Sequence, residues 1–110
     1  MISADAIRGY VDVMVLSLLR TGPSYAYELA QRIGEVTGED YSIKQTTLYS
    51  AVKRLEASGH VSSFPGVSPS GKPRTYYQIT ALGIEHLRLK VTEWRSTKSV
   101  VDRFTEGVQP

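Results

Sequence analysis

The sequence contains no cysteine, which excludes disulfide bridges and thiolate metal sites. Its two histidines, His60 and His86, are isolated from each other in the sequence and predict no metal site. No run of eighteen apolar residues is present, so no membrane span is expected. The N-terminal stretch MISADAIRG lacks the basic region and apolar core of a secretory signal. We therefore expect a cytoplasmic protein that needs no metal or other cofactor.

Catalytic groups are also scarce. The sequence shows no nucleophile with a matching base, no paired carboxylates and no cluster of metal ligands. Acidic residues such as Asp12, Glu28 and Glu35 fall on predicted polar helix faces, and Asp40 falls in a predicted loop. The sequence therefore predicts that the chain is not an enzyme.

The net charge of +2 over 110 residues is small but unevenly distributed. Residues 1–43 carry −3, residues 44–76 carry +4, and residues 77–110 carry +1. A basic block in the middle of a chain can attract a polyanion. An ordinary solvated face is the alternative, and the charge alone does not decide between them.

Hydrophobic periodicity predicts three helices in the first half. The first covers AIRGYVDVMVLSLLRTG, and its wide apolar arc must be covered on more than one side. The second covers SYAYELAQRIGEVTG, with Ser24 as N-cap and Gly38 at the C-terminal end. The third begins near Gln45 and ends at Ser58. Its apolar positions are Leu48, Ala51, Val52 and Leu55.

The second half of the chain changes pattern. Residues 60–66 and 73–79 predict a β-hairpin around the turn-rich VSPSGKP, and Thr80 predicts the cap of a last helix over about 81–105. Such a helix is roughly 36 Å long at 1.5 Å per residue and would extend beyond the small body before it. Its apolar residues recur at steps of three and four, which favours a homodimer. A helix folded back on its own domain is the alternative.

Three helices followed by a hairpin are typical of a winged helix-turn-helix. The predicted fold is mainly α (α+β), with a DNA-binding domain over 1–80 and a dimerisation helix with a frayed tail over 81–110. In this layout the third helix enters the major groove of DNA. Gln45, Thr46 and Ser50 can hydrogen-bond base edges or phosphates, and Lys53 or Arg54 can contact phosphates. The hairpin tip, with Lys72 and Arg74, can reach the backbone or the minor groove.

Three stretches also carry a resemblance: AIRGYVDVMVLSLLRTGPSYAYELAQRI, TTLYSAVKRLEASGHV and GKPRTYYQITALGIEHL. They resemble the PadR family of bacterial transcriptional regulators, in the short form whose last helix completes a dimer. The resemblance implies a homodimer on a palindromic operator, usually a repressor released by a small aromatic or drug-like compound. It also implies that Tyr49, and Tyr25 or Tyr27, contact the phosphate backbone of the DNA. The alternative is that these tyrosines pack against the protein with their hydroxyls in water. The expected DNA-binding residues are Gln45, Thr46, Thr47, Tyr49, Ser50, Lys53, Arg54, Lys72, Arg74 and Tyr25.

Trp94, the only tryptophan, lies on the apolar seam of the predicted last helix and is expected near the dimer axis. In the short PadR form a tryptophan at a similar place can stack flat aromatic ligands between subunits. Plain interface packing is the alternative role for Trp94. The expected effector and dimer residues are Trp94, Val11, Met14, Val15, Leu87 and Val91.

Two other binding functions compete with regulation of transcription. A winged helix that mediates only protein contacts usually replaces the polar third helix with acids or apolar residues, whereas this helix is polar and basic. Binding of single-stranded RNA would call for exposed aromatics between basic strands, and RTYY is the one such cluster. The operator, the regulated genes and the effector do not follow from the sequence.

Overall fold

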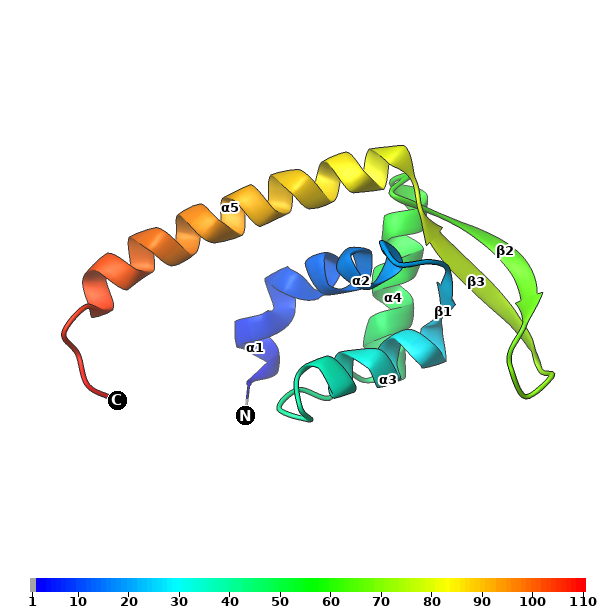
Figure 1. Cartoon of the computed structure of the whole chain (residues 1–110), viewed down its shortest axis with the longest axis horizontal. Helices are drawn as coiled ribbons and strands as arrows, with labels where there is room; N and C mark the ends of the chain where they lie inside the picture. The colour runs from blue at the N-terminus through cyan, green and yellow to red at the C-terminus, as the bar shows by residue number, and fades with distance from the viewer. Residues whose placement is uncertain (1) are drawn as a thin grey trace.

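The computed structural model describes residues 2–110, which form a winged body and a long C-terminal helix (Figure 1). The helices of the body are α1 (Ala4–Ile7), the 3₁₀ turn η1 (Arg8–Tyr10), α2 (Val11–Leu19), α3 (Ala26–Val36) and α4 (Gln45–Ala57). Its strands are β1 (Ser24–Tyr25), β2 (Val61–Val67) and β3 (Pro73–Ile79), and α5 (Ala81–Thr105) follows. The order confirms the predicted α+β winged helix fold.

Helix α2 lies at the centre of the body and packs against α3, α4, α5 and β3. This position explains the wide apolar arc of its sequence. Val15, Leu16 and Leu19 are buried, while Met14 and Leu18 on other faces are half-buried against the same core. The remaining buried core comes mainly from α3 and α4, together with Val61 and Tyr77 of the sheet and Leu87 of α5.

The first predicted helix is wrong at its start, because the segment is broken into α1, η1 and α2. The break falls at Gly9 and Tyr10. Glycine is a poor helix former, and Tyr10 has φ −116° and ψ 0°, outside the α-helical region. The chain therefore changes direction before it enters the core as α2 (Figure 1).

Ser24 is not the N-cap that the sequence predicted. It lies in β1, opposite Tyr77 of β3, and its hydroxyl donates a 2.6 Å hydrogen bond to Glu28 Oε1. Tyr25 occupies the N-cap position instead, without a side-chain cap bond. The short strand makes the sheet three-stranded, in the order β1-β3-β2. It fixes the start of α3 against the hairpin of β2 and β3, which is the wing of the fold.

The hairpin and the last helix agree with the sequence prediction within a residue or two. The side-chain oxygen of Thr80 accepts a 3.0 Å hydrogen bond from the N–H of Gly83, as an N-cap should, and donates to the carbonyl of Gly59 at 2.7 Å. Gly83 is buried here, and a Cβ at this position would collide with the carbonyl of His60. The first turn of α5 is therefore held closely against the start of the wing.

Candidate nucleic-acid interface

Helix α4 has one buried face and one exposed face, as its sequence predicted. Leu48, Ala51, Val52 and Leu55 are at most 2% exposed and attach the helix to the core. The predicted DNA-binding residues of this helix are all exposed: Gln45, Thr46, Thr47, Tyr49, Ser50, Lys53 and Arg54. The helix therefore presents hydroxyls, an amide and two cations to solvent from a rigid element.

A carboxylate that the sequence reasoning left without a role connects α4 to the wing. Glu56 Oε1 accepts a 3.1 Å hydrogen bond from Lys53 Nζ, and its other oxygen accepts a hydrogen bond from the hydroxyl of Ser63 on β2. The Ser63 bond, followed by the Lys53 bond, lowers the pKa of Glu56. The same ion pair raises the pKa of Lys53, whose ammonium also lies 5.9 Å from the centroid of the Tyr49 ring. The i,i+3 spacing of Lys53 and Glu56 on an expected helix could have predicted this ion pair from the sequence.

Arg54 forms an ion pair that links α4 to α2. Its Nη2 lies 2.6 Å from Asp12 Oδ1, although the arginine side chain is 59% exposed. A phosphate contact by Arg54 would therefore compete with Asp12. The sequence could not have shown this pair, because 42 positions separate its members.

The wing carries two further predicted cations in different surroundings. Lys72 is exposed in the turn between β2 and β3, whereas Arg74 is half-buried at the start of β3. The guanidinium carbon of Arg74 lies 5.5 Å from the centroid of the Tyr25 ring. Tyr25 in turn contacts Tyr76 edge to face at 5.3 Å. The structure thus brings two predicted residues, Tyr25 and Arg74, into direct contact across β1 and β3.

A family comparison decides what kind of protein presents these surfaces. Residues 15–89 match the model of the transcriptional regulator PadR-like family. The chain belongs to the PadR family. The match covers the second half of the core helix α2, all of α3 and of the exposed helix α4, the wing and the first part of α5.

Individual proteins similar to this PadR-family chain agree with the assignment. An uncharacterized protein of Lysinibacillus sphaericus is 37% identical over 99% of this chain and 100% of its own length. A transcriptional regulator from Clostridium thermocellum is 48% identical, with a TM-score of 0.88 over 96% of this chain and all of its own. A PadR family transcription regulator from Clostridium difficile is 34% identical, with a TM-score of 0.76 over 87% of this chain and 98% of its own.

Membership of the PadR family makes the chain a DNA-binding transcription regulator and confirms that it is not an enzyme. The resemblance read from its sequence motifs is therefore confirmed. None of the helices within residues 2–110 is long and apolar enough to cross a membrane.

The predicted effector residues do not gather in one cavity of the PadR-family chain. Trp94 is 41% exposed and packs edge to face on Tyr10, with ring centroids 5.0 Å apart. Leu87 and Val91 line a groove between α2 and α5, and Met14 is half-buried against the core. Val15, expected among the effector and dimer residues, has no exposed surface and is enclosed by the core of its own chain. Val11 is likewise a core residue at 6% exposed.

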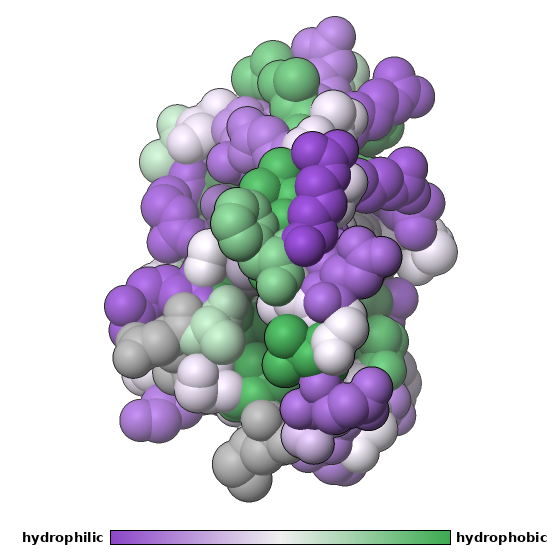
Figure 2. Space-filling model, turned by 90° about the vertical axis from the view of Figure 1, so that its left-hand side faces the viewer, coloured by the Kyte–Doolittle hydropathy of each residue, from purple (hydrophilic) through white to green (hydrophobic). Residues whose placement is uncertain are grey.

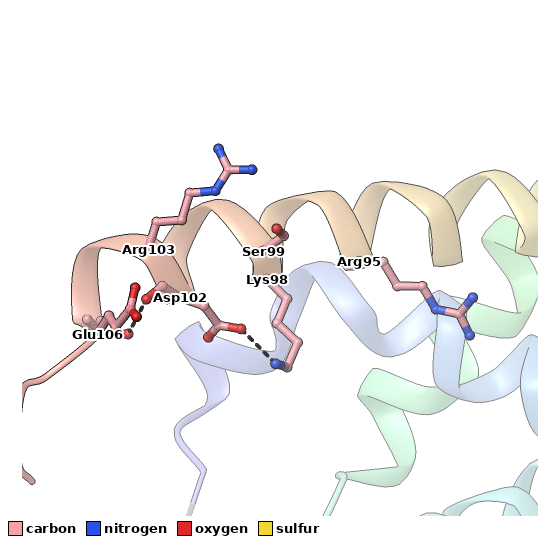
Figure 3. A pocket seen from close by; sticks show the side chains of 7 residues that line it. Arg95, Lys98, Ser99, Asp102, Arg103 and Glu106 are labelled. Carbon is pink, nitrogen blue, oxygen red and sulfur yellow. Dashed lines mark hydrogen bonds and ion pairs between the residues drawn. The ribbon is translucent and has the colours of Figure 1, made fainter.

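The end of α5 has a hollow of a different kind (Figure 3). All seven of its lining residues lie between Arg95 and Glu106 on this one helix and its C-cap. Arg95, Lys98 and Asp102 project to one side and Arg103 to the other (Figure 3). Walls from a single helix make an open polar furrow, which is unlike the enclosed, mostly apolar sites that small aromatic molecules occupy.

Proposed function

We propose that the chain works in the cytoplasm as a homodimeric repressor that binds a palindromic operator. The observation that carries the proposal is the division of α4 into a face fully packed on the core and a face of exposed amide, hydroxyl and cationic groups. A recognition helix needs this rigid attachment on one side and hydrogen-bonding groups for base edges on the other. In the dimer, two such helices would lie roughly 34–36 Å apart, one turn of DNA.

The distal part of α5 supports the dimeric part of the proposal. Every residue from Thr92 to the end of α5 is exposed in the single chain, including Val100, Val101 and Phe104. A view onto the end of the molecule where α5 terminates shows hydrophobic side chains along the middle of the surface, flanked by hydrophilic ones (Figure 2). A second copy of α5 and its surroundings would remove this apolar surface from water.

We further propose that a small aromatic or drug-like effector releases the repressor from DNA. Trp94, 41% exposed and packed on the half-buried Tyr10, supplies aromatic surface on the same helix as the proposed dimer contact. A ligand stacked there can shift the dimer only as far as its affinities for the DNA-binding and released forms differ. Because Trp94 is the only tryptophan, its fluorescence reports directly on a panel of flat aromatic compounds.

The DNA-binding part is tested by selecting duplexes from a randomised pool and comparing the selected duplex with a scrambled one over a salt series. We expect a clear preference for the selected duplex, with affinity that falls steeply as salt rises. No preference together with a flat salt response would instead favour a winged helix that mediates only protein contacts.

Two variants assign roles within this interface. Lys53→Ala should weaken binding to both duplexes and reduce the salt slope by about 1, because a phosphate contact carries no sequence information. Thr46→Ala should reduce the preference for the selected duplex by about 1–3 kcal/mol if its side chain contacts a base. Lys90→Ala is the matched control, since Lys90 is a half-buried lysine that forms the same kind of i,i+3 ion pair, with Glu93, but lies on α5. An unchanged salt response for Lys53→Ala would remove Lys53 from the contact set.

A further inference from the structure

The register of the wing sheet gathers an arginine and three aromatic residues on one face. Tyr25 of β1 lies opposite Tyr76 of β3, and Phe64 of β2 lies opposite the same Tyr76. Side chains at directly opposed positions of antiparallel strands share a face, as do residues two apart on one strand. Arg74 therefore lies on the same face as Tyr76, next to Tyr25, where β1 runs alongside β3 (Figure 1).

Ring contacts order this face. Phe64 and Tyr76 stack with centroids 5.7 Å apart, and Tyr76 meets Tyr25 edge to face. The Tyr76 ring also covers Gly66, the register partner of Arg74, and a Cβ at Gly66 would come within 2.5 Å of that ring. The Tyr76 hydroxyl donates a 2.8 Å hydrogen bond to the carbonyl of Val67, which fixes the ring. Tyr25 therefore packs on the Tyr76 ring, which is itself held by Phe64 and by its own hydroxyl.

Arg74 differs electrostatically from the other cations of the proposed interface. Lys53 and Arg54 each pair with a carboxylate, whereas no ion pair within residues 2–110 involves Arg74. Its Nε is the one buried side-chain nitrogen or oxygen of the described residues that has no hydrogen-bond partner. A buried N–H is normally hydrogen-bonded, so another interaction must hold the Arg74 guanidinium in this place. The Tyr25 ring provides that interaction, since a guanidinium over an aromatic ring is attracted by the ring quadrupole.

We propose that Tyr25 is a positioning residue whose ring holds Arg74 ready for a DNA phosphate. The inference rests on the proposed DNA-binding function and gives Tyr25 a role through its ring rather than through its hydroxyl. With Nε buried and the guanidinium carbon held over the Tyr25 ring, the two terminal nitrogens are left to bind a phosphate. Because no carboxylate competes for Arg74, the contact costs no ion pair, in contrast to a contact by Arg54.

A double-mutant cycle on the selected duplex tests the proposal. Arg74→Ala and Tyr25→Leu should each weaken binding by about five- to tenfold, and the combined variant should be no weaker than Arg74→Ala alone. Tyr25→Phe, which keeps the ring, should bind within about twofold of the wild type. Arg74→Lys should not restore the affinity, because an ammonium lacks the planar fork.

Lys72 provides the matched control, since it is an exposed wing cation with no ring contact to Tyr25 within the described chain. The effects of Lys72→Ala and Tyr25→Leu should therefore multiply in the combined variant. If Tyr25→Phe binds as weakly as Tyr25→Leu, the hydroxyl contacts the DNA itself and the positioning role is overturned. Effects of Tyr25→Leu and Arg74→Ala that multiply would overturn it equally.

A measurement on the free protein separates this inference from the proposed function. The side-chain protons of Arg74 should show an upfield ring-current shift by NMR in the wild type and in Tyr25→Phe, and should lose it in Tyr25→Leu. A wild type that binds no duplex but shows the shift would overturn the DNA-binding function and leave the stacking intact. A wild type without the shift would overturn the positioning role even if DNA binds, and this outcome does not depend on whether Tyr25→Leu folds.

Discussion

The two parts of α5 have similar lengths but very different surroundings. In residues 81–91, Gly83 and Leu87 are buried and Val91 is half-buried against the body. In residues 92–105 every side chain is exposed, and Phe104 reaches 82%. The helix nevertheless continues without a break through both parts, as the long rod in Figure 1 shows.

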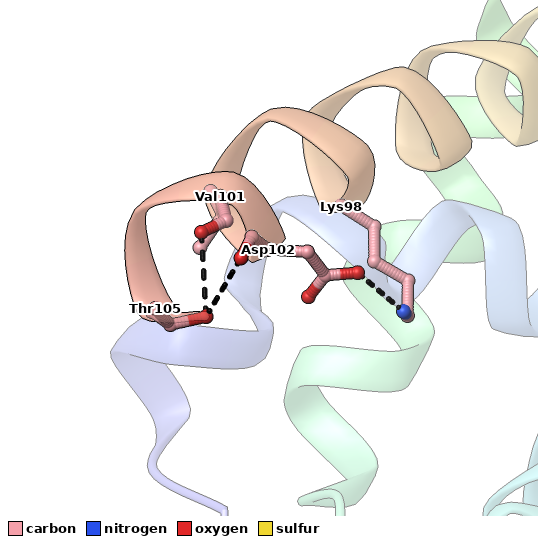
Figure 4. A network of polar contacts seen from close by, with 4 residues as sticks. All are labelled: Lys98, Val101, Asp102 and Thr105. Carbon is pink, nitrogen blue, oxygen red and sulfur yellow. Dashed lines mark hydrogen bonds and ion pairs between the residues drawn. The ribbon is translucent and has the colours of Figure 1, made fainter. Parts of the chain in front are cut away.

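Apart from Trp94, whose ring meets Tyr10, the distal part is supported by local polar contacts within the described residues. Lys98 Nζ lies 2.8 Å from Asp102 Oδ2, and the hydroxyl of Thr105 donates to the carbonyls of Val101 and Asp102 (Figure 4). An exposed i,i+4 ion pair stabilises a helix by only about 0.3–0.5 kcal/mol, and helices of this length are marginal in water. The comparison teaches that the body stabilises the proximal part, whereas we propose that the distal part is stabilised mainly by contacts outside the chain. A second copy is what we propose.

The largest expected effect follows from removing a side chain that joins α5 to the body. Leu87→Ala should lower the free energy of unfolding by about 3 kcal/mol, because it leaves a cavity in the core at a side chain that is 6% exposed. Leu89→Ala, two positions along the same helix and 65% exposed, is the control and should change stability by less than about 0.5 kcal/mol. Urea unfolding measures both, and equal losses would show that the two positions are packed alike.

A slightly smaller loss is expected where α5 begins. Gly83→Ala should cost about 2 kcal/mol, because the new methyl group would collide with the backbone carbonyl of His60 and force α5 away from the wing. Gly9→Ala is a matched control, since an added Cβ there meets nothing within 4 Å. Thermal melting of both variants checks this. A Gly83→Ala protein as stable as the control would mean that α5 can shift away from His60 at little energetic cost.

In the distal part, the same kind of change should affect association rather than folding. Replacing Val101 and Phe104 together with serine should weaken dimerisation by about tenfold or more, equivalent to roughly 1.4 kcal/mol, because it removes exposed apolar surface that only a partner can bury. Val36→Ser, at a 75% exposed valine on α3, is the control. Sedimentation over a concentration series gives the dissociation constant. An unchanged value would place the dimer contact elsewhere.

Local pattern was enough to predict most elements of the fold. Apolar residues recur at a regular spacing in each of α4, the hairpin and α5. Gly59 marks the end of α4, Pro73 the start of β3 and Thr80 the start of α5, so these bounds follow from the sequence. Strand β1 could not be found in this way, because two residues carry no periodicity and their pairing partners lie about fifty positions later. The break at Tyr10 was missed because the apolar spacing continues across it.

The exposure of the candidate site was predictable to a similar degree. The exposed face of α4 follows from helical periodicity, and the structure agrees residue by residue. What the sequence could not show is which charges are already paired, since Asp12 meets Arg54 only through the packing of α2 on α4. It also could not show which side of α2 its own chain covers, and this is why Val15 was expected at a subunit interface but lies in the core.

The smallest expected effect concerns acid stability at the junction between α5 and the body. The rings of His60 and His86 stack with centroids 4.0 Å apart, and burial, followed by the charge of His60, lowers the pKa of His86 below its usual 6.5. Lys90 acts in the same direction, whereas Asp12 and Glu93 oppose it. Between the lowered pKa and 6.5 the unfolded chain binds more protons at His86 than the folded chain, so this contribution is complete above 6.5 and is lost as the pH falls.

His86→Phe keeps a flat ring against His60 but removes the titrating group. Between pH 7.5 and pH 5.5 the wild type should therefore lose more of its free energy of unfolding than His86→Phe, as measured by urea unfolding at both values. Leu89→Ala, an exposed substitution on the same helix, should retain the pH dependence of the wild type. If His86→Phe lost as much stability on acidification as the wild type, protonation of His86 would not account for the loss.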